Sequence, residues 1–327
     1  MTTTISNVTP LDATASAASV IDVEPIAPMK AKRKPWGFAF WLAVFWLVSV
    51  VVATAIANLL DWKKEVDFLG TVEVTEGRWS KTISRLHPFG LNLGGNDILV
   101  DLVRGAKNSL IIAAFTVVLG FVIGGTLGMV AGYFRGGVDT VMSFCANVLL
   151  SVPPLLFILL MIAVLSARGT TPGSTAQGLS SSVFKVSLAL GILSIPQIFR
   201  VVRASTIQFA QREFVMAARA MGAKVPRILL GDILPNVAKP MLAYGLVAAG
   251  SVMVIEGGLS FLGVGVGSGT DTTAWGKQIS AASQKADLVK APMVALIPGI
   301  ALFLTVLSFN YIGDKARERL ETKQGAL

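Results

Sequence analysis

The sequence is poor in charged residues and has a single cysteine and a single histidine. Only 14% of its 327 residues are Asp, Glu, Lys or Arg, whereas a typical soluble domain has about a quarter. Cys145 has no second thiol for a disulfide, and together with His87 it is too little for a zinc site of Cys and His ligands. With a mean hydropathy of +0.69, the composition indicates an integral membrane protein, in which Cys145 is expected to be a packing residue.

Motifs that would give the chain its own chemistry or energy source are also missing. No G-x-x-x-x-G-K-[ST] segment is present to hold ATP phosphates, and the glycine-rich run at 257–269 does not fit G-x-G-x-x-G. The predicted membrane segments contain no histidine and almost no charge near their centres, which argues against an intramembrane enzyme and a secondary transporter. We therefore expect no catalytic residue, no metal and no cofactor in this chain.

Long uncharged segments make up most of the sequence. Four of them contain 23 to 28 residues each, more than the roughly 20 that cross a hydrocarbon core as a helix. Two further apolar runs are interrupted by charge only near their ends, where long side chains can reach the headgroups. The sequence thus predicts an all-α polytopic membrane protein with six transmembrane helices. They are expected at residues 36–60, 107–132, 139–166, 183–203, 238–260 and 292–313.

The remaining segments differ in composition. Residues 1–35 are mostly Thr, Ser, Ala and Pro without periodicity and end in a basic cluster, which predicts a disordered cytoplasmic tail with a basic anchor. We expect 61–106 to be an extracytoplasmic segment and 314–327 a short cytoplasmic tail. The other five helices form one transmembrane domain at 107–313, which contains a long polar loop at 204–236.

The excess of basic residues predicts orientation. A net charge of +9 on a soluble protein would suggest nucleic acid, but on a membrane protein it mainly decides which side faces the cytoplasm, so no nucleic-acid partner is expected. An even number of spans places both termini on one side, and that side carries 16 of the 28 Lys and Arg residues. We therefore expect both termini and the 204–236 loop to be cytoplasmic.

The 204–236 loop contains a short amphipathic pattern. Phe214, Ala217, Ala218 and Met221 occur at i, i+3, i+4 and i+7, which predicts one apolar stripe on a short helix. Gly222 is expected to end this helix, and a proline four residues later begins the next one. The small residues would let a partner's backbone approach closely and transmit its movement. The alternatives are a helix on the inner leaflet or one packed on its own bundle.

Two other features leave alternatives open. Glu256, at the outer end of the fifth span, would either face the translocation pathway and meet a peptide's amino group, or extend to the surface as a helix-end carboxylate. Gly120, Gly124 and Gly128 form two overlapping G-x-x-x-G units, which favour close helix contact within the bundle or with a partner.

Three prolines fall inside predicted spans. Pro153, Pro154 and Pro196 would act as hinges for alternating access or form static kinks.

The loop resembles the coupling motif of binding-protein-dependent ABC importer permeases. That pattern has a glutamate, two alanines, a glycine and, after a fixed gap, Ile-Leu-Pro. The matching residues are Glu213, Ala217, Ala218, Gly222, Ile233, Leu234 and Pro235. Over residues 85–327 the chain is further similar to the C-type permease of dipeptide, oligopeptide and nickel importers. This similarity includes HPFG from His87, GGLSFLGVG from Gly257 and AWGKQIS from Ala274, although Leu91 and Asn92 replace the usual Thr-Asp.

The resemblance implies a type I ABC importer transmembrane domain in a bacterial inner membrane. It implies a second permease as heterodimer partner, two cytoplasmic ATPase subunits that bind the ATP, and an extracytoplasmic substrate-binding protein. The substrate would be a di- or oligopeptide, with nickel or another small solute as the alternative. A stand-alone secondary transporter is the alternative from another class. The ATPase-docking residues would be Glu213, Phe214, Ala217, Ala218, Met221, Gly222 and Pro235.

Overall fold

The computed structural model describes residues 36–59, 88–90, 97–167, 180–265, 274–284 and 292–324. The predicted tail at 1–35 and most of the 61–106 segment lie outside the described residues. The elements, in chain order, are α1 (Phe38–Leu59), α3 (Ile98–Leu119), η3 (Gly120–Gly125), α4 (Thr126–Phe134), α5 (Gly136–Ser151), α6 (Pro154–Ala167), α7 (Ser180–Phe209), α8 (Glu213–Ala220), α9 (Val225–Arg227), η4 (Ile228–Ile233), α10 (Leu234–Phe261), α11 (Trp275–Gln284) and α13 (Met293–Gln324).

The all-helical class is confirmed. Five helical segments of the described chain are long and apolar enough to cross a membrane, and α5 with α6 makes a sixth if that bent pair is one span. Two segments begin earlier than hydropathy predicted, at Ile98 and Val225. The first does so because the Asp97 carboxylate accepts a hydrogen bond from the Leu99 N–H at 2.7 Å and caps α3 in a polar stretch. A helix thus extends beyond its apolar segment where capping side chains and neighbouring residues satisfy the backbone hydrogen bonds of its end.

The third predicted span, 139–166, is not one continuous helix. It breaks between Ser151 and Pro154, and α5 and α6 meet at 89°. A residue before proline avoids the helical region, and proline is favoured at the first position of a new helix, so Pro153-Pro154 ends one helix and begins another. Pro196, in contrast, lies inside α7 without a break.

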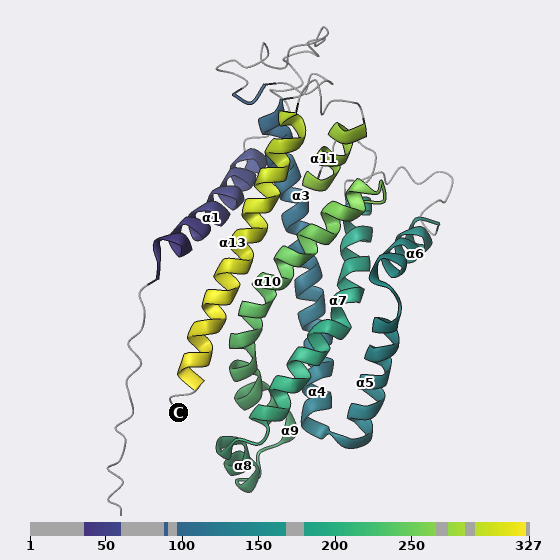
Figure 1. Cartoon of the computed structure of the whole chain (residues 1–327). Coiled ribbons are helices and arrows are strands. Elements are labelled where there is room, and N and C mark those ends of the chain that lie inside the picture. The colour runs from purple at the N-terminus through teal and green to yellow at the C-terminus, as the bar shows by residue number, and fades with distance from the viewer. Residues whose placement is uncertain are drawn as a thin grey trace, which may run out of the picture.

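The helices form a bundle in which α1 lies at one edge and α5 and α6 lie at the opposite edge (Figure 1). One core cluster, which includes Ile112, Met253 and Trp275, joins α3, α10 and α11. A second cluster includes Val215 and Ile228 and lies at the end that carries α8. The first helix is attached to the last by the indole N–H of Trp46, which donates to Thr305 Oγ1 at 2.9 Å.

The contact between η3–α4 and α7 is unusually close because glycines line it. We call these residues the glycine seam: Gly120, Gly124, Gly128 and Gly132. A methyl group on Gly124 would lie 2.5 Å from the Ile195 carbonyl oxygen, and one on Gly128 would lie 2.7 Å from that of Phe199. Both distances are too short for real contacts. The G-x-x-x-G repeat therefore makes close helix contact within this bundle.

Replacement of Gly124 by alanine should destabilise the bundle, whereas the same change at the neighbouring Gly125 should not. Alanine at Gly124 would overlap backbone of α7, which we expect to cost about 1–3 kcal/mol. A methyl group at Gly125 meets nothing within 4 Å, and alanine generally favours a helix over glycine by up to about 1 kcal/mol. Thermal unfolding of the purified variants in detergent would compare them. Equal unfolding temperatures of the two variants would contradict the close contact at the glycine seam.

Candidate functional site

The predicted coupling loop is shorter than 204–236. α7 continues to Phe209, and the return helix begins at Val225 and runs through α9 and η4 directly into α10. Only 210–224 stands outside these long segments, with α8 at its centre and at one end of the bundle (Figure 1). At the first bend the Ala210 N–H donates to the Thr206 carbonyl at 2.8 Å. Both ends of α8 are therefore connected to membrane helices by short, hydrogen-bonded turns.

Gly222 ends α8, as the sequence predicted, and does so by adopting a left-handed backbone conformation. Its φ is +78°, a region that costs other residues about 1–2 kcal/mol. The Ala223 N–H donates to the Ala218 carbonyl at 3.0 Å and the Gly222 N–H donates to the Arg219 carbonyl at 2.9 Å. These two bonds form a Schellman motif. The requirement for glycine is conformational, because a Cβ atom at this position would meet nothing within 4 Å.

A residue that the sequence analysis missed holds α8 to the bundle. Val215 is fully buried and packs in the second core cluster with Ile228 and Ile233. Ala218, one turn further along α8, is partly buried against the same cluster. The i, i+3 spacing of Val215 and Ala218 is visible in the sequence, but Ala218 also belongs to the longer predicted stripe, which does not include Val215.

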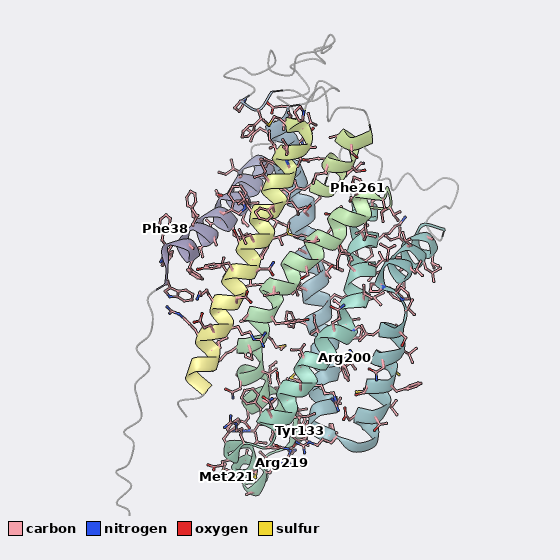
Figure 2. The ribbon with its side chains drawn as sticks, viewed as in Figure 1. Phe38, Tyr133, Arg200, Arg219, Met221 and Phe261 are labelled. Carbon is pink, nitrogen blue, oxygen red and sulfur yellow. The ribbon has the colours of Figure 1, made fainter. Side chains whose placement is uncertain are left out.

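The predicted apolar stripe faces away from the bundle. Phe214 and Met221 are 43% and 81% exposed, and Ala217 and Gly222 are exposed as well. Figure 2 shows Met221 at the tip of the molecule. α8 thus packs on its own bundle through Val215 and Ala218, whereas the rest of the stripe does not take part in that contact. An apolar face presented in this way needs a partner or a membrane surface.

Three further loop residues have distinct positions. Glu213 is exposed in the first turn of α8, where its carboxylate interacts favourably with the helix dipole. The Arg219 guanidinium lies 4.6 Å from the centroid of the Tyr133 ring and so joins α8 to α4 by a cation–π contact. Pro235 lies outside α8 and is exposed near the start of α10, inside the continuous helical segment Val225–Phe261.

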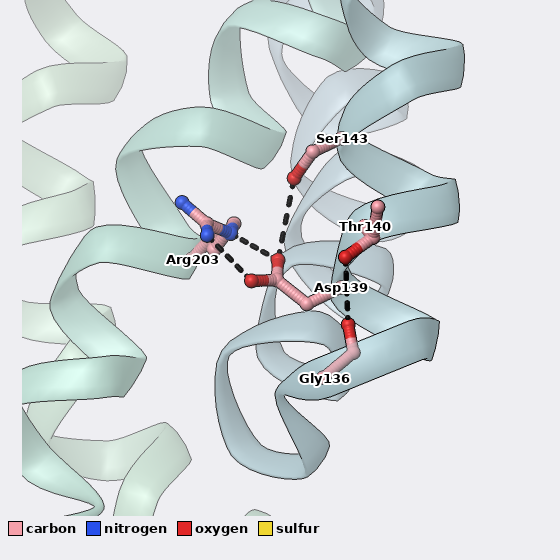
Figure 3. Close-up of polar contacts among 5 residues, drawn as sticks. All are labelled: Gly136, Asp139, Thr140, Ser143 and Arg203. Atoms are coloured by element: carbon pink, nitrogen blue, oxygen red, sulfur yellow. Dashed lines mark hydrogen bonds and ion pairs between the residues drawn. The ribbon is translucent and has the colours of Figure 1, made fainter.

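An ion pair at the same end of the bundle joins α5 to α7 (Figure 3). The Arg203 guanidinium donates from Nε and Nη2 to the two carboxylate oxygens of Asp139, with Nη2 to Oδ2 at 2.5 Å. Ser143 Oγ adds a third donor to this carboxylate at 3.2 Å. A bidentate ion pair of this kind fixes the relative orientation of the two helices as well as the distance between them. Nothing in the sequence distinguishes Arg203 beyond its place among the basic residues.

Glu256 is buried rather than at the surface. Its side chain is 0% exposed, and its carboxylate accepts hydrogen bonds from Ser260 Oγ at 2.8 Å and from Ser109 Oγ at 3.4 Å. Ser109 Oγ in turn accepts a hydrogen bond from the backbone N–H of Trp275 at 3.3 Å. The prediction that this carboxylate extends to the surface is wrong, because hydroxyl donors from two helices satisfy it inside the protein. It connects α3, α10 and α11 at the end opposite α8.

Comparison with known proteins agrees with this arrangement. Residues 124–324 match the family model described as "Binding-protein-dependent transport system inner membrane component". The chain is 32% identical over 310 residues to the glutathione transport system permease protein GsiD of Pectobacterium atrosepticum, covering 91% of this chain and 95% of that protein. It is 32% identical over 237 residues to the dipeptide transport system permease protein DppC of Alkalihalophilus pseudofirmus, covering 72% of each.

A solved structure shares the fold. The inward-facing MetNI methionine ABC transporter contains a chain that superposes with a TM-score of 0.54 at 20% identity, covering 68% of this chain and 97% of that one. The bundle described above therefore has the fold of that transporter's membrane chain. With a family match over more than half of its length and relatives above 30% identity, the chain belongs to the binding-protein-dependent transport system inner membrane components, as a permease subunit of an ABC importer.

Proposed function

We propose that this chain forms half of the translocation pathway of an ATP-driven importer of di- or oligopeptides. The relatives that support a peptide substrate transport glutathione and dipeptides according to their names. A second, similar permease completes the pathway as a heterodimer. Two ATPase subunits bind on the cytoplasmic side, and an extracytoplasmic binding protein delivers the substrate.

The observation that carries the proposed coupling is the two-sided character of α8. Val215 fixes its inner face in the core, while Phe214, Ala217 and Met221 form an exposed apolar outer face. Since short turns connect both ends of α8 to long membrane helices, a force applied to the outer face moves α7 and α10. Closure of the ATPases on ATP would draw the two coupling helices together and switch the bundle from inward-open to outward-open.

We further propose that both termini are cytoplasmic. α8 and the end of α13 lie toward the same end of the bundle (Figure 1). Arg135, Arg212, Arg219 and Arg227 all lie in or beside the turns at this end, as the positive-inside rule requires of a cytoplasmic surface.

Ala217→Arg should abolish ATPase docking without affecting membrane insertion. Ala217 is exposed on α8 and lies outside the core, and arginine is a good helix former, so α8 should persist with a bulky charge on its docking face. We expect ATPase co-purification to fall about tenfold or more, the effect typical of a central interface residue. Gly222 is less suitable for this test, because any side chain there strains the cap.

Gly137→Arg is the matched control. Gly137 lies at the same end of the bundle in the first turn of α5, is exposed, and a Cβ atom there would meet nothing within 4 Å. This variant should retain ATPase co-purification and uptake. If Ala217→Arg retained both as well, α8 would not be the coupling helix, and a helix on the inner leaflet would be the better explanation.

The topology has a separate test. A reporter that is active only outside the cytoplasm should be silent when fused after Leu327 and active when inserted near Gly77. The physical reason is the concentration of basic residues on the side of the termini. The reverse pattern would place α8 outside the cell and out of reach of any ATPase.

A further inference from the structure

Four exposed polar side chains face outward between α5 and α7. We call them the polar patch: Asn147, Ser151, Gln197 and Arg200. The Arg200 guanidinium Nη2 donates to Asn147 Oδ1 at 2.7 Å and so bridges the two helices. Gln197 is one turn before Arg200, and Ser151 is one turn after Asn147, so each extends the patch along its own helix.

The patch lies within helical segments that are long and apolar enough to span a membrane. Arg200 is part of the apolar spanning segment Ser182–Phe209, and the nine residues from Arg200 to the end of that segment span about 13 Å at the rise of an α-helix. Figure 2 shows Arg200 between Met221 at one end of the bundle and Phe261 toward the other. Charged and amide side chains at this depth are costly against lipid and instead face protein or water.

The patch carries a net positive charge. Arg203, three residues after Arg200, is paired with the Asp139 carboxylate, which cancels its charge. The hydrogen-bond partner of Arg200 within the described part of the chain is the Asn147 amide, which is neutral. A guanidinium in this setting offers its remaining N–H groups in a planar arrangement that fits a carboxylate.

The patch is accessible from outside the chain, whereas Glu256 is not. Glu256 is completely buried, so a solute moving along the surface of this subunit would not reach it. The patch also lies on α7, the helix that continues into the turn before α8. A group bound at Arg200 would thus sit on the helix that moves with α8.

We propose that the polar patch lines the water-filled translocation pathway, and that Arg200 binds the terminal carboxylate of a peptide during its passage. This proposal rests on the proposed importer function and deepens it by naming the substrate group and the residue that receives it. Asn147 holds the guanidinium in place, and Gln197 and Ser151 provide neutral hydrogen-bonding groups for the peptide backbone.

Water access is the first test, and the chain contains its own control. Cys145 is exposed on α5, contrary to its predicted packing role, and lies on an apolar face with Val141 and Val148. In the complete transporter in nanodiscs, a charged methanethiosulfonate should modify Gln197→Cys made in a Cys145→Ser background. The same reagent should leave the natural Cys145 unmodified. No reaction at Gln197→Cys would show that protein or lipid covers the patch and would overturn the proposal.

The second test separates charge recognition from structure. In proteoliposomes with ATP and the binding protein, uptake of a dipeptide is compared with uptake of its C-terminal amide. Arg200→Gln should raise the KM for the free dipeptide about tenfold or more, as expected for loss of a charge-assisted pair, and should leave the amide unaffected. Arg200→Lys, which keeps the charge, should retain part of the preference for the free acid.

The outcomes distinguish this proposal from the one on which it rests. An equal loss of uptake for both substrates in Arg200→Gln would make Arg200 a structural residue and overturn the proposal. A wild-type complex that imports neither the dipeptide nor its amide would overturn the peptide function instead. The labelling of Gln197→Cys would then still decide whether the patch faces the pathway.

Discussion

The close approach of η3–α4 to α7 along the glycine seam is the constraint on which the rest of the structure depends. Lipid supplies no hydrophobic driving force between helices, so close packing and polar bonds hold such a bundle together. Gly124 and Gly128 leave room for the backbone carbonyls of α7, and the Asp139–Arg203 pair fixes α5 against the same helix. α7 is therefore held on two sides, and its position determines where α8 emerges.

In the proposed mechanism, α7 connects transport to ATP hydrolysis. One side of α7 packs on the glycine seam, another carries Arg200 in the polar patch, and its end leads through a short turn to α8. α8 is in turn fixed by Val215 in the core and by the contact of Arg219 with Tyr133. A displacement of α8 is thus passed to α7 as a rigid element rather than absorbed in a flexible loop.

The sequence predicted those features that local patterns encode. Uncharged runs predicted the helical class and most of the spans, and the spacing of Phe214, Ala217 and Gly222 predicted a short helix and its end. Pro153 and Pro154 predicted a hinge or a kink inside the third span, but composition does not encode its angle, so the 89° bend after Ser151 was not predicted. The burial of Glu256 depends on Ser109, 147 residues away in the chain, and such pairings leave no local pattern.

Site-specific photocrosslinking from the tip of α8 tests the central claim most directly. Met221 is 81% exposed at the end of the proposed docking face, and Leu160, 65% exposed on α6, is a comparison site outside it. In the assembled transporter, a photoreactive residue in place of Met221 should capture the ATPase subunit, whereas one in place of Leu160 should not. Capture of lipid alone from position 221 would contradict the coupling role of α8.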